Sequence, residues 1–420
     1  MVKLVVKPPP EWGTEPVPAE KRVLRSIDYF ILWSSLAVGL LVLEAGGLLV
    51  GLPMPVALAI ALLGSVIGSI MLALAGGLGS KYGLPTMVSL RGVLGLRGSY
   101  LPTTLNVIQL ISWGAFEILV MAESARSISG EFLGSYTTYF WVFFFATLCM
   151  LMSLGGPLTV IRQWLEKFAI WLVYGTAAFI TYIILCKAAY LPFQVGEPMP
   201  VGLALDLVIA MPISWWPLIS DYNRFSKSEK GAFIGTTTGY AFTNFWFYAL
   251  GILLIGYIGG SAISAITSIT FGGLALAILL ADETDNGFAD IYSASVSIQN
   301  VSPKSKQWKI IIAVTVVSVL MATLMPGQWQ LAYQDFLVYI GAVFVPLLGV
   351  FTMDFYIIKK KQYELEEFYA SAKHFRIKPA IAWFIGIIAY FILYFYTTIG
   401  SSILSFVISA LVLYLLEKAI

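Results

Sequence analysis

Apolar runs of about 18 residues or more recur along almost the whole chain, and they limit its possible folds more than any other feature. Hydrophobic residues make up 59% of the 420 residues and charged residues only 11%, whereas a soluble protein carries roughly a quarter charged residues. Runs of this length indicate membrane-spanning helices. The sequence therefore predicts an all-α polytopic membrane protein with twelve transmembrane helices, at 27–50, 54–78, 101–122, 137–155, 167–188, 200–220, 232–258, 272–298, 309–325, 331–357, 379–397 and 400–418.

The basic residues predict how these spans are oriented. Lys and Arg concentrate in the cytoplasmic loops of membrane proteins. With twelve spans, all 25 basic residues except Arg126 and Lys187 fall on the side of the N-terminal tail. We therefore expect both termini in the cytoplasm and the protein in the plasma membrane. The net charge of +2 follows from this topology, so no nucleic-acid partner is expected.

Two spans contain residues that interrupt helices. Span one has the sequence LEAGG at 43–47, and span six has PISWWP at 212–217. A proline removes a backbone donor, so the carbonyls that it frees must face a cavity or an ion rather than lipid. Transporters built from inverted repeats place their sites at such breaks, in corresponding positions of the two halves. The alternative is that the glycines only permit close helix packing and the prolines only kink the helix.

The interrupted spans are the first and the sixth, which predicts a five-plus-five inverted repeat with two extra helices. The N-terminal tail has five prolines between residues 8 and 18 and no apolar signal-peptide region, so it is expected to be disordered. We predict a disordered cytoplasmic tail at 1–25, a first five-helix repeat at 26–190 and an inverted second five-helix repeat at 198–358. A cytoplasmic linker at 359–378 and two additional helices at 379–420 follow. The protein is expected to be a monomer.

Span eight carries acidic residues near the middle of the bilayer. Asp282, Asp285 and Asn286 recur at i, i+3 and i+4, which places them on one helical face. Charged groups in the hydrocarbon region cost about 2.5–3.5 kcal/mol each on insertion scales, so they usually serve an interior cavity. Several facing carboxylates repel one another, which indicates a proton or a bound cation. The alternative is that the acids lie at the cytoplasmic mouth of the span.

Span three has a similar polar stripe. Asn106, Gln109, Trp113 and Glu117 follow spacings of three and four and share a face. A tryptophan with a carboxylate one turn later suits a planar heteroaromatic ligand, and the tryptophan pair at 215–216 could cover its other face. The alternative for these tryptophans is an interfacial anchor.

Catalytic motifs are missing from the sequence. The single histidine, His374, falls in a cytoplasmic loop, and no phosphate-binding GxxxxGK loop or HExxH motif occurs. We expect no catalytic residues, no cofactor and no metal beyond a possible sodium ion. An intramembrane hydrolase could use only paired aspartates such as Asp282 and Asp285, and it remains a distant alternative.

Five segments of the chain resemble one known family. They are VLEAGG, GLPTMVSLRGVLGLRGSYLPTTLNVIQL, WGAFE, PISWWPLISDYNRFSKS and ADETDNGFADIYSASVSIQN. On these segments the chain resembles the nucleobase:cation symporter-1 family, which is purine/cytosine permease-like, and within it the branch assigned to hydroxymethylpyrimidine, the thiamin precursor. The resemblance runs from about residue 25 to 360. It implies the five-plus-five fold shared with neurotransmitter:sodium symporters and a planar substrate held between tryptophans of spans three and six.

The resemblance also implies roles for individual residues. The substrate-binding residues would be Trp113, Glu117, Trp215 or Trp216, Asp285 and Asn286. The family's sodium site lies between span-one carbonyls and span-eight hydroxyls, which implies the backbone near Glu44 and Ala45 together with Thr284. Glu283 replaces the first of the usual pair of hydroxyl residues. A carboxylate there could bind sodium more strongly or carry a proton, so the coupling ion stays open between the two.

Glu117 bears on the substrate. An ionised carboxylate accepts hydrogen bonds and donates none, so it suits an exocyclic amine, as on hydroxymethylpyrimidine or cytosine, and disfavours a carbonyl, as on uracil. We therefore expect a secondary active importer of a planar pyrimidine, hydroxymethylpyrimidine first, coupled to sodium or a proton by alternating access. The alternative substrate is cytosine or another nucleobase or hydantoin-type compound.

Overall fold

The computed structural model describes residues 12–157, 168–325, 329–369 and 373–419, and within them the chain is almost entirely helical. The helices are η1 (Ala19–Lys21), α1 (Ser26–Ser35), α2 (Leu40–Leu48), η2 (Leu49–Gly51), α3 (Met54–Ala75), α4 (Gly77–Tyr82), α5 (Thr86–Leu94), α6 (Tyr100–Ser129), η3 (Gly134–Tyr136), α7 (Thr137–Gly155), α9 (Ile170–Ala188), α10 (Val201–Trp215), η5 (Trp216–Leu218), α11 (Ile219–Asn223), α12 (Glu229–Ile258), α13 (Ala262–Thr267), α14 (Gly272–Val301), α15 (Gln307–Leu324), α16 (Trp329–Thr352), η6 (Met353–Ile358), η7 (Leu365–Phe368), α17 (Ile377–Tyr396) and α18 (Ser402–Lys418).

Most of these helices can cross a membrane. Within the described residues, nine helical segments are long and apolar enough, and the bent pair formed by Ser26–Ser35 and Leu40–Gly51 could make a tenth span. The predicted spans 272–298 and 400–418 correspond to α14 and α18. Helix α14 carries four acidic residues and α18 has only 17 residues, so neither meets the same criterion of length and composition.

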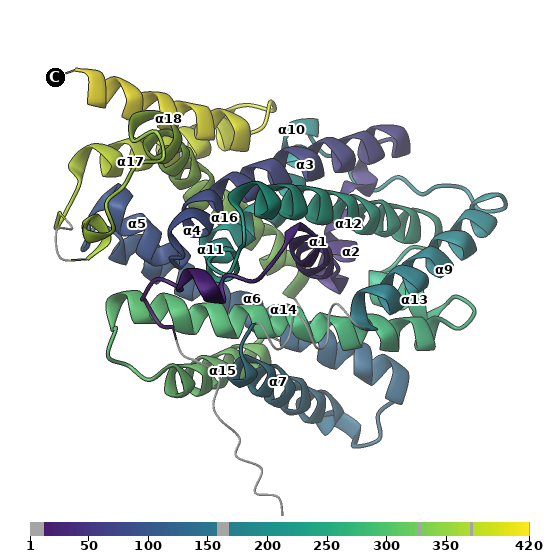
Figure 1. The fold of residues 1–420 in the computed structure, drawn as a ribbon. Coiled ribbons are helices and arrows are strands. Elements are labelled where there is room, and N and C mark those ends of the chain that lie inside the picture. The colour runs from purple at the N-terminus through teal and green to yellow at the C-terminus, as the bar shows by residue number, and fades with distance from the viewer. Residues whose placement is uncertain (1–11, 158–167, 326–328, 370–372, 420) are drawn as a thin grey trace, which may run out of the picture.

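Helix α14 lies at the centre of the packing. In Figure 1 it crosses the molecule between the group that contains α1 and α12 and the pair α7 and α15. It packs against α6, α7 and α15. Because α14 is surrounded by protein, its acidic residues lie inside the bundle and not against lipid: Asp282, Glu283, Asp285 and Asp290 are each at most 3% exposed.

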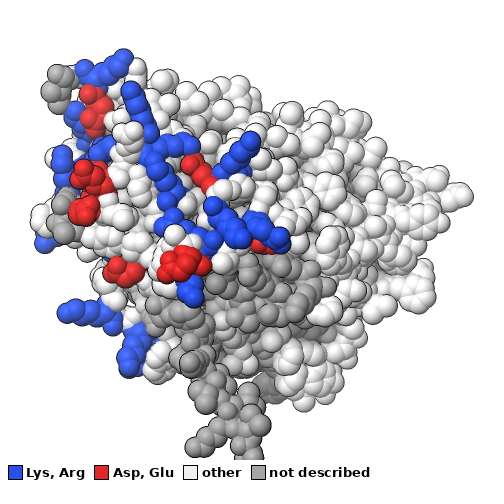
Figure 2. Space-filling model, in the orientation of Figure 1, with Lys and Arg blue, Asp and Glu red and all other residues white. Residues whose placement is uncertain are grey.

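The helix contacts pair up between the two halves of the chain. In the first half the predicted spans one and two begin with α1 and α3, and in the second half spans six and seven begin with α10 and α12. Helix α1 packs on α12, and its counterpart α10 packs on α3. Helices α3 and α12 also pack on each other. Helix α6 packs on α7 and α15, as α14 packs on α15 and α7. The pair α17 and α18 packs on α16 at one side of the molecule. Charged side chains gather at one end of the face seen in Figure 2, and the other end is almost free of them.

The break in span one lies earlier than the sequence predicted. Helix α1 ends at Ser35 and α2 begins at Leu40, with a bend of 66° between them. Span one is broken as predicted, but the LEAGG segment at 43–47 lies inside α2, so the prediction that these residues form the break is wrong. Its glycines serve close packing: a Cβ on Gly46 would lie 2.5 Å from the carbonyl oxygen of Tyr248 in α12. The alternative of close helix packing therefore describes this pair of helices.

The break predicted in span six is a 3-10 turn at the position of the prolines, within a helical span that is continuous over Val201–Asn223. Helix α10 ends at Trp215, a 3-10 turn follows over Trp216–Leu218, and the chain continues as α11. Pro217 lies within the turn, whereas Pro212 remains inside α10. A Cβ on Gly68 of α3 would lie 2.3 Å from the Pro212 ring, so Pro212 packs closely against that helix.

Residues 12–25 are packed against the helix ends, so the prediction of disorder over 1–25 is wrong for this part; residues 1–11 lie outside the described residues. The Arg22 guanidinium donates hydrogen bonds to the backbone oxygens of Val17, Lys81 and Tyr82 at 2.9–3.0 Å. The Arg224 guanidinium donates to the Gly13 oxygen at 3.0 Å. A high proline content excludes a regular helix, but such a segment can still pack where arginine side chains donate to its carbonyls.

Arg91 links α5 to the C-terminal end of α14. Its guanidinium donates to the side chain and the backbone oxygen of Asn300 at 2.7 and 3.0 Å, and to the Phe368 oxygen at 3.2 Å. We expect Arg91→Ala to lower the free energy of unfolding by about 1.5–3 kcal/mol, because hydrogen bonds to a buried charged group are lost. Thermal unfolding in detergent measures this. Arg97→Ala, which removes the same charge from an exposed position, is the control, and equal unfolding temperatures for the two variants would contradict the prediction.

Candidate functional site

A small buried cavity lies where α6, α10 and α14 meet the break between α1 and α2. Its lining comes from segments far apart in the sequence: Leu36, Gly39, Leu41, Val42, Trp113, Glu117, Met211, Ser214, Trp215, Asn286 and Asp290. The cavity volume is about 10 Å³, roughly enough for one water molecule. A pyrimidine is larger, so its binding here requires side chains or helices to move apart.

Two tryptophans from different halves of the chain line this cavity. Trp113 of α6 packs edge-on against Tyr333 and Phe336, with ring centroids 5.8 and 5.2 Å apart. Trp215 of α10 packs edge-on against Trp33 at 6.3 Å. These edge-to-face contacts fix the orientation of both indoles beside the cavity that they line.

Trp216 points away from the cavity. It is fully buried, its indole nitrogen donates to the Phe344 oxygen at 2.9 Å, and its ring packs against Phe351. Of the two adjacent tryptophans left open by the sequence, Trp215 is therefore the one that lines the cavity.

Two amides on α6 bind the carbonyls at the break in span six. The Gln109 side chain donates to the Ser214 oxygen at 3.1 Å, and the Asn106 side chain donates to the Pro217 oxygen at 3.4 Å. Carbonyls released by a broken helix need such donors inside a membrane protein. The polar stripe on span three thus has two parts, one that supports the break and one, formed by Trp113 and Glu117, that lines the cavity.

Span eight contributes both predicted and unpredicted residues to the cavity. Asn286 lines it, as does Asp290 one turn later, which the site prediction missed although the i, i+4 spacing from Asn286 was visible in the sequence. Asp285 does not line the cavity and lies near Asp282 and Ser35. None of the described lining residues is Lys, Arg or His.

Three residues of α14 bind the break in span one. The Asp282 carboxylate accepts a hydrogen bond from the Ser35 hydroxyl at 3.0 Å. Both Glu283 oxygens accept from the backbone nitrogen of Leu40, at 3.1 and 3.0 Å. The Asn286 amide donates to the Val38 oxygen at 2.9 Å.

These contacts place Glu283 at the N-terminal end of α2. The first N–H groups of a helix have no partner within it and carry partial positive charge, so a carboxylate there is stabilised. The acids of span eight therefore serve the broken segment of span one.

Two residues expected near the cation lie past this break. Glu44 and Ala45 are inside α2. The Glu44 carboxylate accepts a hydrogen bond from the Ala262 nitrogen at 2.9 Å, at the start of α13. The expected location of these two residues at the break is therefore wrong, because the helix restarts at Leu40.

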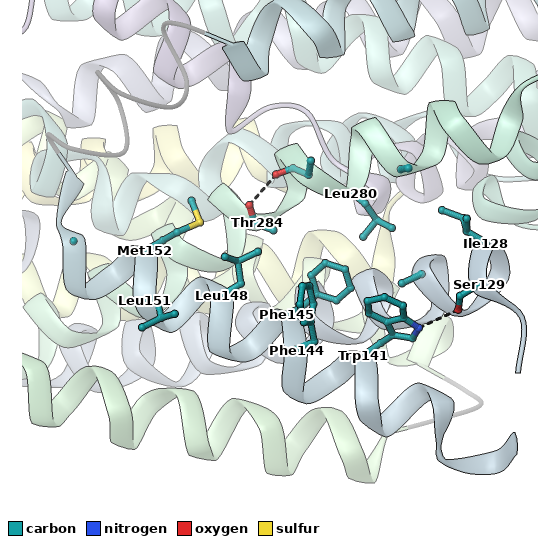
Figure 3. Close-up of a pocket in the computed structure, with 14 residues that line it drawn as sticks. Ile128, Ser129, Trp141, Phe144, Phe145, Leu148, Leu151, Met152, Leu280 and Thr284 are labelled. Carbon is teal, nitrogen blue, oxygen red and sulfur yellow. Dashed lines mark hydrogen bonds between the residues drawn. The ribbon is translucent and has the colours of Figure 1, made fainter. Parts of the chain in front are cut away.

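Thr284 lies on a different face of α14. It lines an apolar groove of about 870 Å³ between α6, α7 and α14, together with Phe145 and Leu148 (Figure 3). Its hydroxyl donates to the Ala281 oxygen at 2.8 Å. Thr284 is thus not joined with Glu283 at the break, because adjacent residues of a helix point about 100° apart. Among the described residues, no group of three or more His, Cys, Asp or Glu side chains is arranged to hold a metal ion.

Comparison with known proteins gives a consistent match. The family model described as permease for cytosine/purines, uracil, thiamine and allantoin matches residues 16–416. A putative purine-cytosine permease, YxlA, from Bacillus subtilis is 22% identical over 378 residues, 84% of this chain and 80% of that protein. A hydantoin permease from Microbacterium maritypicum is 22% identical over 331 residues, 72% of this chain and 66% of that protein.

Solved structures match the fold. The nucleobase-cation-symport-1 family transporter Mhp1, in a closed conformation with bromovinylhydantoin bound, superposes with a TM-score of 0.84. The match covers 96% of this chain and 94% of Mhp1 at 16% sequence identity. At this identity the likeness concerns the fold.

Proposed function

Because this chain belongs to the permease family for cytosine/purines, uracil, thiamine and allantoin, and is thus a multi-pass membrane transporter and not an enzyme, we propose that it imports a planar pyrimidine in symport with a cation. Hydroxymethylpyrimidine is the leading substrate, and cytosine or another nucleobase or hydantoin-type compound is the second candidate. The main observation behind this proposal is the cavity beside the break in span one, which Trp113, Trp215 and Glu117 line together.

Glu117 supports an amine-bearing pyrimidine. Its Oε2 atom is buried and has no hydrogen-bond partner among the described residues. A buried acceptor without a partner costs about 1–3 kcal/mol, and an exocyclic amine would supply the missing donor. Hydroxymethylpyrimidine and cytosine both carry such an amine, whereas uracil presents a carbonyl in its place.

The proposed architecture is a five-plus-five inverted repeat. The paired packing of α1 on α12 and α10 on α3, and of α6 and α14 on α15 and α7, supports it. The charges gathered at one end of the molecule in Figure 2 support cytoplasmic termini in the plasma membrane. We further propose that the protein works as a monomer.

The proposed cation site lies at the break in span one, near Glu283 and the α2 N-terminus, and sodium or a proton would occupy it. One monovalent cation that moves inward through 100 mV contributes about 2.3 kcal/mol, enough for roughly fifty-fold accumulation. Rocking of one helical group against the other would expose the site alternately to the two sides.

Titration of the purified protein with hydroxymethylpyrimidine, cytosine and uracil tests this function. Tryptophan fluorescence is followed with and without sodium at fixed ionic strength, and at several pH values. We expect saturable quenching by the two amine-bearing pyrimidines and at least tenfold weaker binding of uracil. Ligand and coupling ion must strengthen each other equally, so a sodium-dependent affinity indicates sodium and a pH-dependent one indicates a proton. Saturable binding of uracil alone would contradict the preference for an amine-bearing pyrimidine, and binding of none of the three would contradict a pyrimidine substrate.

A further inference from the structure

A basic pocket of about 520 Å³ lies at the charged end of the molecule. Among the described residues it shares no lining side chain with the cavity beside the break in span one. Its walls come from the ends of α5, η6 and α18 and from the segment that leads into α17, and α5 and the C-terminal end of α18 lie on this side in Figure 1. The cationic side chains that line it are Arg91, Lys359, Lys373, Arg376 and Lys378.

The positive charge of the pocket is only partly balanced by carboxylates. Three of the five cations have such a partner. These ion pairs are Lys359 with Glu367 at 2.8 Å, Arg376 with Asp354 at 2.8 Å and Lys378 with Glu417 at 3.6 Å. Arg91 and Lys373 form no ion pair with a carboxylate within the part of the chain that the structure describes. Two positive charges therefore remain in excess, which favours an anionic occupant.

Arg91 is the buried member of this group, with only 5% of its surface exposed. Its three hydrogen bonds go to neutral oxygens, those of Asn300 and the Phe368 backbone. A guanidinium carries five N–H donors, so these bonds do not use all of them. A buried charge is costly unless an opposite charge balances it. An anion in the pocket would supply that charge.

The wall that carries Lys373 and Arg376 is fixed by backbone hydrogen bonds to the segment after α5. The Leu96 nitrogen donates to the Lys373 oxygen at 2.8 Å, and the Arg376 nitrogen donates to the Leu94 oxygen at 2.8 Å. The backbone on which both cations sit is thus already ordered without a ligand. A site that is formed in advance loses less entropy when it binds.

An apolar stripe on α17 leads from the pocket into the membrane-spanning region. Ile377, the first residue of α17, lines the pocket and is exposed. Ile381, Phe384 and Ile388 are exposed as well, and their spacing of three or four residues places all four side chains on one face of the helix. Helix α17 is long and apolar enough to cross a membrane. A charged group bound in the pocket would therefore have a lipid-facing surface directly beside it.

We propose that this pocket binds the phosphate headgroup of an anionic phospholipid, with one acyl chain along the exposed stripe of α17. Basic pockets between membrane-spanning helices bind anionic headgroups in this way. Arg91 and Lys373 supply the unbalanced charge, and Lys378 lies between them and the stripe in the order of the chain. Because α5, η6, α17 and α18 all contribute to the walls, the lipid would hold the two C-terminal helices against the rest of the bundle. The inference does not depend on which compound is transported.

Native mass spectrometry of the full chain, purified in detergent, tests the site. Phosphatidylglycerol is titrated against phosphatidylcholine with the same acyl chains, and glycerol 1-phosphate is added as a soluble competitor. We expect phosphatidylglycerol to bind at least fivefold more tightly than phosphatidylcholine, and glycerol 1-phosphate at equal concentration to displace less than a tenth of it. Equal affinity for the two lipids would overturn recognition of the charge. Displacement by glycerol 1-phosphate would instead identify a soluble phosphate compound as the ligand and overturn the lipid.

Three variants locate the bound lipid. The Lys373→Gln and Lys378→Gln double variant should bind phosphatidylglycerol about 25-fold more weakly, roughly fivefold for each lysine. The matched control removes the same charge at Lys304 and Lys306, which are exposed between α14 and α15, and should bind as the wild type does. Glu417→Gln removes an acid that lines the pocket and should strengthen binding about fivefold, a gain that misfolding cannot produce. Equal losses in the two double variants, or weaker binding by Glu417→Gln, would overturn the proposal.

Discussion

Replacement of Trp113 by alanine is expected to weaken the binding of hydroxymethylpyrimidine or cytosine roughly 5- to 150-fold. The estimate follows from the about 1–3 kcal/mol that one aromatic side chain contributes when it stacks on a base. Trp113 lines the cavity, and its ring makes edge-to-face contacts with Tyr333 and Phe336. Trp215→Ala should have a similar effect, because Trp215 lines the same cavity from α10. Equilibrium binding to purified protein measures both.

Three controls separate binding from folding. Trp308→Ala removes a half-exposed tryptophan at the start of α15 and should leave the affinity unchanged. Trp216→Phe loses the hydrogen bond to the Phe344 oxygen, so it should lower the unfolding temperature without a comparable loss of affinity. Trp113→Phe should recover part of the binding. If Trp113→Ala binds as tightly as the wild type while Trp216→Phe does not, the ligand stacks on the other tryptophan and the assignment is wrong.

The second large effect is expected from Glu283→Ala, which should reduce ion-coupled uptake at least tenfold. The variant leaves the Leu40 nitrogen without its acceptor at the start of α2. Loss of a buried hydrogen bond to a charged group costs about 1.5–3 kcal/mol, and the negative charge that would attract the coupling ion is removed with it. Uptake of radiolabelled hydroxymethylpyrimidine into proteoliposomes, with an imposed sodium or proton gradient, measures the effect.

Thr284→Ala is the matched control because it changes the next residue of the same helix. Thr284 lines the groove between α6, α7 and α14, and its hydroxyl donates to the Ala281 oxygen within α14. Its replacement should leave coupled uptake within about twofold of the wild type. The reverse pattern, with uptake lost in Thr284→Ala and kept in Glu283→Ala, would show that the cation lies on the groove side of α14.

Relative positions on one helix were predictable from the sequence. Trp113 and Glu117 are four residues apart, and the structure places both at one cavity. Asp282 and Asn286 also share a face, and both bind the break in span one. Such pairs follow from the 3.6-residue period of the helix, which needs no knowledge of the neighbouring helices. The same period would have identified Asp290.

The position of the break in span one was not predictable in the same way. The LEAGG segment has the glycines expected of an interruption, yet it is helical and packs against α12. The actual break at 36–39 is apolar and contains one glycine. It is stabilised from outside by Asn286 and Glu283, which bind Val38 and Leu40 from a helix some 240 residues later.

The sequence by itself determined the membrane class, the helical architecture, the break in span six and the polar faces of spans three and eight. Length of apolar runs, proline chemistry and helical period are local properties, so a single chain segment carries them. Tertiary structure alone decided that Trp215 and not Trp216 lines the cavity, that Thr284 lies on the groove side of α14 and that Glu283 binds the start of α2. Each of these depends on how one helix is rotated against another, and that rotation is set by packing between residues far apart in the chain.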